Sequence, residues 1–345
     1  MRRRAIWLLA LLPLCMPALL AGQQTRPAGS GRGRTLGGHL FIPSTTFADP
    51  FVASYVRSLI GAGSATNLQV PIYNVSDSLV TTLQGNLSFL EIDLEYQQRV
   101  LGWLALRVNA AGLARSGTET PTLLSEGLAA VYGFGLGATA RIWGNDKLLL
   151  SGALDSRSNQ LFSITPLDYV QGVGQAIRRV LDSLQAIGGV TIDSVVIDSV
   201  IDAINLKGYS LFKDDHSSAT TGGLRAAYVP VPWLGLTGLL QTGIAGIFSG
   251  TKDKGVIDVG AAASVDFDQL WRVPLGFNLS GRWRSVSDRG SDIAKSSTQV
   301  GVGLAYTGRD DFTIALEAVF ANFQQAKSNA SATGKRLGLA MRYYF

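Results

Sequence analysis

The stretch FTIALEAVF, residues 312–320, alternates between large apolar side chains and small or polar ones. Phe312, Ile314 and Leu316 share one phase, and Glu317 belongs to the other. Successive side chains of a β-strand point to opposite faces, so a period of two predicts a strand with one apolar face. The segment is therefore expected to have an apolar environment on one face, while its small and polar side chains lie on the other.

The same alternation recurs along the chain from about residue 86 onward. The junctions between the alternating segments differ in length: QQRVL, GNDK, PVPW, DQLWRV and GRDD are short, whereas 115–126, 157–218, 249–255, 288–296 and 326–333 are longer. Short turns at one end and long loops at the other are typical of transmembrane β-barrels. A soluble β-sandwich also alternates, but it gives no reason for this asymmetry. The eleven segments lie near 86–96, 102–114, 128–143, 147–156, 219–229, 234–248, 256–267, 274–287, 297–308, 312–325 and 334–345.

The composition narrows the fold class. The 345 residues are 46% hydrophobic and only 16% charged, with 40 glycines and a mean hydropathy of +0.21. Beyond the N-terminus there is no apolar run of about 18 residues, which argues against membrane-spanning helices, and a disordered chain would be more polar. We therefore predict an all-β fold, a transmembrane antiparallel β-barrel of about 12 strands (range 10 to 14). Since single-chain bacterial barrels have an even number of strands, a twelfth strand is expected within residues 35–85.

The N-terminal segment 1–22 has the features of a secretory signal peptide. Arg2, Arg3 and Arg4 precede an apolar stretch from Ala5 to Leu20, and small residues follow. The single cysteine, Cys15, lies in this segment, so the mature chain is expected to have no disulfide and no cysteine-ligated metal. Removing residues 1–22 lowers the 30 basic residues to 27 against 25 acidic ones. A net charge this small argues against nucleic-acid binding.

The C-terminal sequence GLAMRYYF resembles the last strand of Gram-negative outer-membrane β-barrel proteins. Gly338, Met341, Tyr343 and the terminal Phe345 carry the resemblance, whereas Leu337 stands where the family usually has a polar residue. The resemblance implies recognition by the barrel-assembly machinery, a location in the bacterial outer membrane among its lipid and lipopolysaccharide, and both termini on the periplasmic side. The short turns would then be periplasmic and the long loops external.

Tryptophans gather beside the short turns. Trp103, Trp143, Trp233 and Trp271 all lie at or next to one. Because amphipathic rings favour the membrane–water interface, these four residues are expected to form an aromatic girdle at one level of the barrel.

Two regions are predicted to lie outside the barrel wall, which we place at residues 67–345. Residues 23–66 are expected to form either a tether or a plug in the lumen, with a short helix from Pro50 to Ile60 that Asp49 caps. Residues 157–218 are expected to form a helical external loop, since apolar residues within 170–184 follow helical spacing. A connection this long is usually functional or mobile.

The phase opposite to the apolar one carries charged side chains that should face the lumen. They could pair with one another inside a narrow barrel, or they could form a constriction that screens solutes. Arg336 and Arg342 on the last strand could reach the first carboxylates, because barrel closure brings the two strands together. The set is Glu91, Asp93, Glu95, Arg107, Arg141, Arg225, Arg282, Arg284, Glu317, Arg336 and Arg342.

The function that fits these features best is passive transport of a small, possibly hydrophobic, solute. A barrel of about twelve strands lies between a filled barrel and an open porin, and a plug could occlude it. Fatty-acid transporters of the FadL type also combine an N-terminal hatch with helical outer loops, a likeness of architecture alone.

Two alternatives come from other function classes. A structural or adhesion barrel would bind a partner through the loop 157–218. An outer-membrane lipid hydrolase would use His216 and Ser218, because residues at i and i+2 on a strand share a face. This arrangement resembles that of outer-membrane phospholipase A and of lipid A deacylases.

We expect no cofactor and no metal, since the chain has two distant histidines and lacks a phosphate-binding loop.

Overall fold

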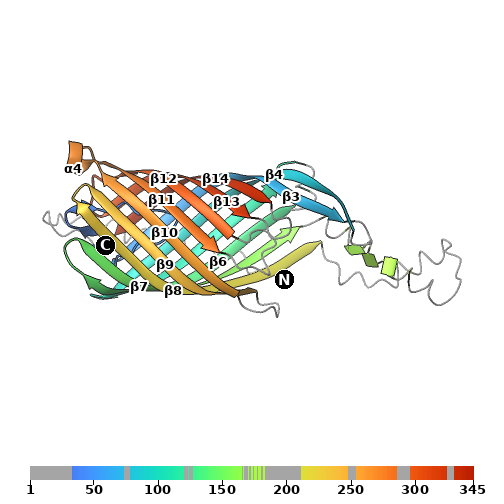
Figure 1. Ribbon diagram of the computed structural model, residues 1–345, viewed down its shortest axis with the longest axis horizontal. Coiled ribbons are helices and arrows are strands. Elements are labelled where there is room, and N and C mark those ends of the chain that lie inside the picture. Colours follow the sequence, from blue (N-terminus) through green and yellow to red (C-terminus); the bar gives the residue numbers. More distant parts are fainter. Residues whose placement is uncertain are drawn as a thin grey trace, which may run out of the picture. The chain divides into compact units, whose positions relative to one another are not determined.

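The barrel is closed and antiparallel. The computed structural model describes residues 33–73, 78–119, 127–164, 211–247, 254–285, 296–324 and 330–345, with isolated positions between 123 and 182. Within these residues the strands form one ring in the order β10-β11-β12-β13-β14-β3-β4-β5-β6-β7-β8-β9 (Figure 1). Neighbours in the ring are neighbours in the sequence, except where β14 meets β3 and closes the barrel.

The twelve strands of the ring confirm the predicted all-β barrel and its predicted twelve-strand count. Their bounds are β3 Tyr55–Tyr73, β4 Leu79–Leu101, β5 Leu104–Gly117, β6 Leu128–Gly144, β7 Leu148–Ile164, β8 Phe212–Val231, β9 Leu234–Ile247, β10 Lys254–Asp266, β11 Leu275–Ser285, β12 Ser296–Tyr306, β13 Phe312–Gln324 and β14 Ser331–Tyr344. One short helix, α4 (Asp268–Trp271), lies between β10 and β11.

The twelfth strand lies within residues 35–85, as expected, but it replaces the helix predicted from Pro50 to Ile60. Strand β3 begins at Tyr55, so the barrel wall starts there and not at residue 67. Alternation explains the difference: Tyr55, Arg57 and Leu59 are buried inside the ring, while Val56 and Ile60 are exposed on its outer face. The pairing of β3 with both β14 and β4 outweighs the local helical tendency.

The predicted bounds of the external insert were also too wide. Strand β7 continues to Ile164 and β8 begins at Phe212, because the alternation in both strands extends past the residues that the sequence pattern assigned to the loop. The described positions between 166 and 182 have helical backbone, and residues 183–210 lie outside the described residues. For the rest of the insert, the helical external loop stays a prediction.

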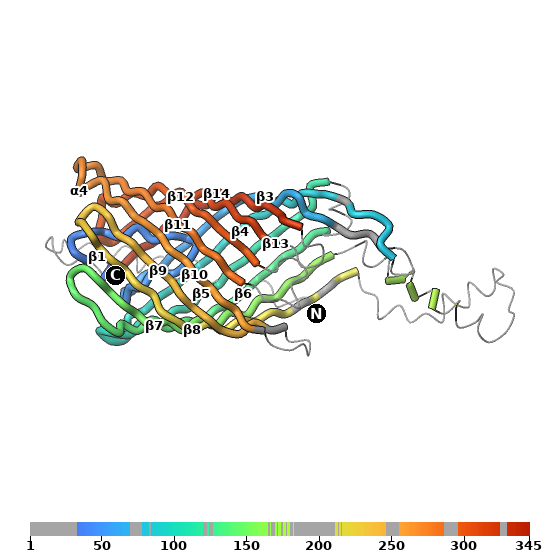
Figure 2. The backbone as a smooth tube through the Cα atoms, in the orientation of Figure 1, coloured from blue at the N-terminus to red at the C-terminus, as the bar shows by residue number. Residues whose placement is uncertain are grey.

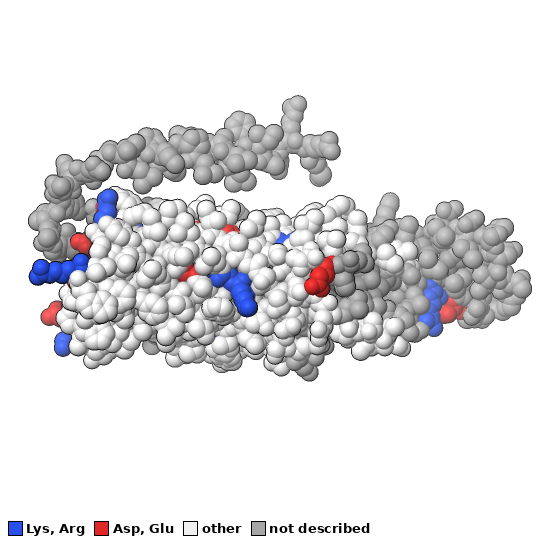
Figure 3. All heavy atoms as spheres, turned by 90° about the horizontal axis from the view of Figure 1, so that it is seen from above, with Lys and Arg blue, Asp and Glu red and all other residues white. Residues whose placement is uncertain are grey.

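The outer face of the barrel is apolar and the inner face is small, polar or charged. Side chains such as Leu136, Leu90 and Phe134 point outward and are 67%, 64% and 60% exposed. Few charged side chains interrupt the wall in the view of Figure 3. A continuous apolar band of this size is unfavourable in water and suits hydrocarbon. Among the described residues no helix has the length and apolarity needed to span a membrane.

The connections define two ends of the barrel. The residues between β4 and β5, β6 and β7, β8 and β9, β10 and β11, and β12 and β13 are short, and we call their side the short-turn end; the opposite side is the long-loop end. Helix α4 belongs to the short-turn end, where β3 begins and β14 terminates (Figure 1).

Residues 33–54, which we call the luminal segment, lie inside the ring. They include the two-stranded ribbon of β1 (Thr35–Leu36) and β2 (His39–Leu40). Figure 2 traces this segment at the end of the barrel that carries α4. The segment meets the wall at many points, as its buried residues Phe41, Ile42 and Phe51 show.

The orientation of the apolar face can be tested at Leu136. Arginine at this position should lower the unfolding free energy of the protein in lipid vesicles by about 2–4 kcal/mol, because the charge would enter hydrocarbon. In Leu270→Arg, on the exposed helix α4 outside the wall, the change should stay within about 0.5 kcal/mol. Urea unfolding in vesicles measures both values, and equal effects would contradict an outward-facing lipid surface.

Candidate functional site

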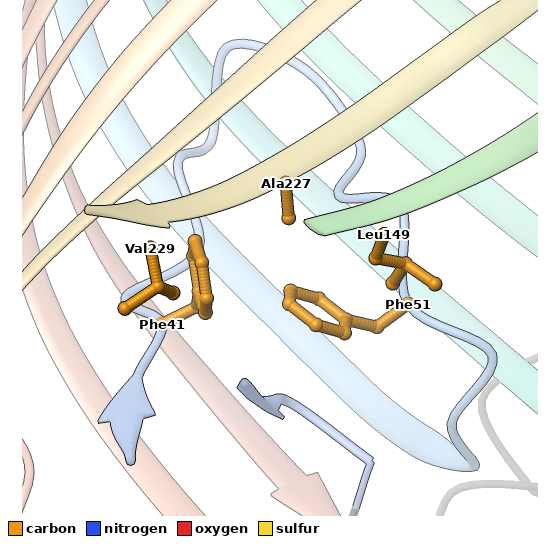
Figure 4. Close-up of a cluster of buried hydrophobic side chains, with 5 residues drawn as sticks. All are labelled: Phe41, Phe51, Leu149, Ala227 and Val229. Carbon is orange, nitrogen blue, oxygen red and sulfur yellow. The ribbon is translucent and has the colours of Figure 1, made fainter. Parts of the chain in front are cut away.

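Apolar side chains fix the luminal segment to one side of the barrel. Phe41 and Phe51 face each other with ring centroids 5.0 Å apart. Leu149 of β7 and Ala227 and Val229 of β8 complete this buried cluster (Figure 4). Deeper in the lumen, Phe47 packs against Leu239 and Ala262 in a second cluster.

Two inward-facing glycines make room for the segment. A Cβ atom added at Gly235 of β9 would overlap the ring of His39, and one added at Gly276 of β11 would overlap Ile42. The wall is thus shaped to the segment, so the fit is more specific than that of a chain lying loosely in a pore.

Polar contacts hold both ends of the luminal segment. Near its start, Arg34 donates to the Arg309 carbonyl at 3.0 Å and also to Thr313. Near its end, Arg342 of β14 donates to Asp49 at 2.5 Å. Gln97 of β4 donates to the Ala53 carbonyl at 2.9 Å, so the chain is anchored where it turns into β3.

The deepest turn of the segment inserts into charged groups of the wall. The Thr45 backbone N–H donates to Glu317 Oε2 at 2.9 Å, and Ser44 Oγ donates to Oε1 of the same carboxylate at 3.2 Å. Arg336 donates to Thr45 Oγ1 and to Glu91, the latter at 3.0 Å. Ser44 and Thr45 therefore contact Glu317 of β13 and Arg336 of β14. Arg336 in turn binds Glu91 of β4, so this turn is connected to three strands.

A charge network surrounds the lumen at the level of this turn. On the β3 side, Arg57 lies 2.7 Å from Asp93 and 3.3 Å from Glu95, and Tyr55 donates to Glu95. Arg342 stands directly opposite Arg57 in the register of β14 and β3. These two arginines avoid repulsion because each binds its own carboxylate, Asp49 in the case of Arg342.

A second group lies across β5, β7 and β8. Asp155 accepts hydrogen bonds from Arg107 and Arg225, and from Gln241 Nε2 at 2.9 Å. One carboxylate therefore compensates two arginines whose side chains are 11% and 2% exposed. Glu95 of β4 also interacts electrostatically with Arg107, so this second group is connected to the first.

A third group lies on β10 and β11. Arg282 Nε donates to Asp258 at 2.8 Å, and the Nε atom of Arg284 is 4.0 Å from the same carboxylate. Arg282 also donates to the Thr46 carbonyl of the luminal segment at 2.5 Å. Again two arginines share one carboxylate.

Ten of the eleven charged residues that the sequence predicts for the lumen lie on the inner face in these groups. Arg141 is different: it shares the inward phase of β6, but its side chain is exposed beside the short turn. Arg336 reaches Glu91, whereas Arg342 turns to Asp49, because β3 lies between β14 and β4 and its Arg57 pairs with Asp93 and Glu95. Other inward charges pair with residues of neighbouring or nearby strands that the sequence did not indicate, as Arg107 and Arg225 do with Asp155.

The sequence interpretation missed Arg57, Asp155 and Asp258 as members of the network. The sequence predicts Arg57 within a helix, although its alternation with Val56 and Ser58 indicates a strand in which Arg57 shares the phase of Tyr55 and Leu59. Asp258 alternates with outward Ile257 and Val259, and Asp155 follows the inward phase of Ser151 and Ala153. Their partners could not be read from one sequence because they depend on the register between strands.

The structure places the four predicted girdle residues at the short-turn end, where all four are exposed: Trp103, Trp143, Trp233 and Trp271.

At the C-terminus, Phe345 is exposed and stacks on Tyr96 with ring centroids 6.1 Å apart. Gly338, Met341 and Tyr343 lie on β14, which closes the ring against β3.

His216 and Ser218 lie on β8, in the outward phase of Leu224 and Tyr228, and are half-buried. His216 Nε2 accepts a hydrogen bond from Gln160 Nε2 at 2.7 Å. In the described part of the chain, no group of three or more His, Cys, Asp or Glu side chains is placed to hold a metal ion.

His39 is the one histidine of the luminal segment and is fully buried. Its Nδ1–H donates to the Pro232 carbonyl at 3.0 Å, and Nε2 accepts from Ser264 Oγ at 2.8 Å. Burial lowers the pKa of His39 from 6.5 to about 4, although the bond to Pro232 opposes the shift. His39 is therefore neutral when the luminal segment occupies the lumen.

No protein-family model matches the chain, and no curated protein does. Among solved structures, the translocator domain of the autotransporter NalP from Neisseria meningitidis matches with a TM-score of 0.47 and 10% identity, over 85% of this chain and 88% of that one. A FadL homologue of Pseudomonas aeruginosa matches with a TM-score of 0.44 and 11% identity, over 91% and 97%. The NanC porin matches with a TM-score of 0.40 and 10% identity, over 85% and 100%.

Replacing the shared carboxylate should be costly. Asp155→Asn leaves Arg107 and Arg225 without their common counter-charge, so we expect the unfolding free energy in vesicles to fall by about 3–5 kcal/mol. Asp311→Asn, which removes the partner of the exposed Arg309, is the matched control and should have little effect. Equal losses for both variants would show that the network does not stabilise the barrel.

Docking of the luminal segment should weaken in acid. His39 has a lowered pKa when docked, so its contribution is complete above about pH 6.5 and declines as the pH falls toward 4. A spin label on Thr35→Cys, an exposed position of β1, should therefore become more mobile on acidification. Adding His39→Gln should remove most of this pH dependence; an unchanged dependence would contradict the role of His39 and assign the effect to other groups.

Proposed function

We propose that this protein is a passive diffusion channel for small solutes in the outer membrane of a Gram-negative bacterium. One observation carries the proposal: a closed barrel that is apolar outside and charged inside holds a fitted segment of its own chain in the lumen. A purely structural barrel has no need of a charged interior, whereas a channel needs polar groups along the path of its solute.

The outer surface supports this location. Trp103, Trp143, Trp233 and Trp271 would form a girdle at the periplasmic interface, because their rings suit the level of the lipid headgroups. The wall between the two ends would contact lipid and lipopolysaccharide. We further propose that the last strand, through Gly338, Met341, Tyr343 and Phe345, is the segment that the barrel-assembly machinery recognises.

The luminal segment would act as the plug that controls passage. Hydrogen bonds, ion pairs and apolar contacts hold it, so it can move without breaking a covalent bond. Twelve strands form a barrel of intermediate width, in which a single inserted segment takes up a large share of the lumen. The proposed transport therefore requires at least partial displacement of residues 33–48.

No catalytic role is proposed. His216 contacts Gln160, and Ser218 pairs in register with Ser158, so both residues lie in the outward phase of β8 and not in the lumen. The charged groups of the lumen are bound to one another and to the luminal segment, which favours solute screening over chemistry.

Deleting residues 25–48 tests the proposal. This deletion keeps Asp49 with its partner Arg342 and leaves strand β3 complete, so the barrel should still close. We expect single-channel conductance in planar bilayers and solute-driven swelling of liposomes to rise severalfold, because the lumen is widened. Heat-modifiable migration on gels provides the control for folding.

Two results would contradict the proposal. If the folded deletion variant and the full chain both leave the bilayer impermeable to ions and to small sugars, the protein is not a channel. If both conduct equally, the luminal segment is not the plug.

A further inference from the structure

The deepest turn of the luminal segment lies against one side of the barrel wall. Thr46 lies against the inward Gly301 of β12, and Phe47 lies against the inward Gly260 of β10. The Thr46 carbonyl also accepts a hydrogen bond from β11, and Thr45 contacts β13 and β14. The turn therefore packs against β10 to β14.

The inward glycines of β6, on the opposite side of the ring, are covered differently. A Cβ atom added at the middle glycine would overlap Asn109 of β5, and one added at the glycine nearer the long-loop end would overlap Asn159 of β7. At the third glycine it would meet Asp155 of β7. In the described part of the chain, none of the heavy atoms nearest to these Cβ positions belongs to the luminal segment. The three glycines are Gly133, Gly135 and Gly137.

The side chains beside these glycines form a row along the lumen, which we call the polar ladder. In register, Asn109 and Arg157 stand on either side of Gly135, and Arg107 and Asp155 stand on either side of Gly137. Alternate residues of a strand are about 7 Å apart, so polar groups recur at this interval along the lumen. The polar ladder consists of Arg107, Asn109, Asp155, Arg157 and Asn159.

Part of the polar ladder is available to a solute. Arg157 is exposed although it belongs to the inward phase of β7, and Asn109 and Asn159 are half-buried. Arg157 Nε donates to Asn159 Oδ1 at 3.1 Å. None of the hydrogen bonds among the described residues involves the Asn109 side chain. Its amide can therefore bind a solute without first losing a protein partner.

The chemistry of the polar ladder suits a neutral solute with several hydroxyl groups. An amide donates and accepts hydrogen bonds, and so does a hydroxyl group. Neighbouring hydroxyl groups can therefore bind Asn109 and Asn159 in either direction. Arg157 and Asp155 are alternate residues of β7 with opposite charges, so an anion or a cation would meet a like charge at this level. A site that binds hydroxyl groups disfavours analogues that lack them, because its own polar groups then have no partner.

The face of β7 that carries the polar ladder ends at the luminal segment. Leu149 belongs to the same inward phase of β7, close to the short-turn end. It packs with Phe41 and Phe51 of the luminal segment in the buried cluster of Figure 4. A solute that follows the polar ladder from the long-loop end therefore reaches an apolar barrier, which opens only when the luminal segment moves.

From this arrangement we propose that the polar ladder binds the solute of the channel, and that the solutes are small sugars and sugar alcohols. The inference rests on the proposed channel function and specifies its substrate class. Asn109 and Asn159 bind the hydroxyl groups, and Arg157 and Asp155 exclude most charged solutes. The solute waits on this side of the lumen until the luminal segment is displaced.

Uptake into proteoliposomes that contain the full-length protein tests the proposal. Erythritol and betaine are of similar size, but erythritol has a hydroxyl group on every carbon and betaine has none. We expect erythritol to enter about threefold faster or more, since one hydrogen bond changes an equilibrium constant about two- to tenfold. Liposomes without protein give the background. Excess xylitol should slow the uptake of erythritol by competition, whereas excess betaine should not.

Variants assign the effect to the polar ladder. Asn109→Leu and Asn159→Leu each replace an amide with an apolar side chain of similar size, so each should lower the ratio of erythritol to betaine uptake. The double variant should bring the ratio close to that of an unselective pore. Asn322→Leu makes the same change at an exposed, outward-facing position of β13 and should leave the ratio unchanged. If the double variant does not fold, the two single variants carry the test.

The outcomes separate this proposal from the channel function. Equal uptake of erythritol and betaine by a protein that conducts potassium chloride would overturn the selectivity for hydroxyl groups and leave the channel function standing. A ratio that falls in Asn322→Leu as much as in Asn109→Leu would show that the polar ladder does not set the selectivity. Exclusion of both solutes and of salt would contradict both proposals.

Discussion

The pairing of β14 with β3 is the constraint on which the rest of the structure depends. Backbone N–H and C=O groups have no water to bind in hydrocarbon, so an open sheet edge there is costly and a closed ring is required. The register runs without a shift from Thr333 opposite Thr66 to Tyr344 opposite Tyr55. Closure also fixes the side chains: the apolar phase of every strand faces outward and the small or charged phase faces the lumen.

A closed ring with charged residues inside must compensate those charges locally. Arg57 between Asp93 and Glu95, and Asp155 between Arg107 and Arg225, are two solutions to this requirement. The luminal segment supplies further partners, Asp49 for Arg342 and the Thr45 amide for Glu317. The charged groups that bind the luminal segment are therefore also groups of the wall. Displacing the segment would leave Arg342 and Glu317 without these partners.

The barrel could be predicted from the sequence because lipid imposes a period of two, as in Phe312, Ile314 and Leu316. The start of the wall could not, because YVRSLI, residues 55–60, was predicted as the end of a helix and becomes a strand only through pairing with β14 and β4. Inward charges such as Arg225 and Glu317 followed from their phase. Their partners could not be predicted from local patterns. The contact of Arg225 with Asp155 depends on the register between strands, and the contact of Glu317 with Thr45 depends on how the luminal segment enters the barrel.

The direction of the apolar phase is tested most directly by scanning β13, Phe312 to Gln324, with single spin labels in lipid vesicles. Cys15 is the single cysteine of the sequence, so a chain expressed without residues 1–22 has no competing thiol. Collision with oxygen, which concentrates in hydrocarbon, should be frequent at Ile314, Leu316 and Phe320 and rare at Ala315 and Val319. A flat profile, or a water-soluble relaxing agent reaching the first three positions as readily as oxygen does, would contradict a lipid-embedded closed barrel.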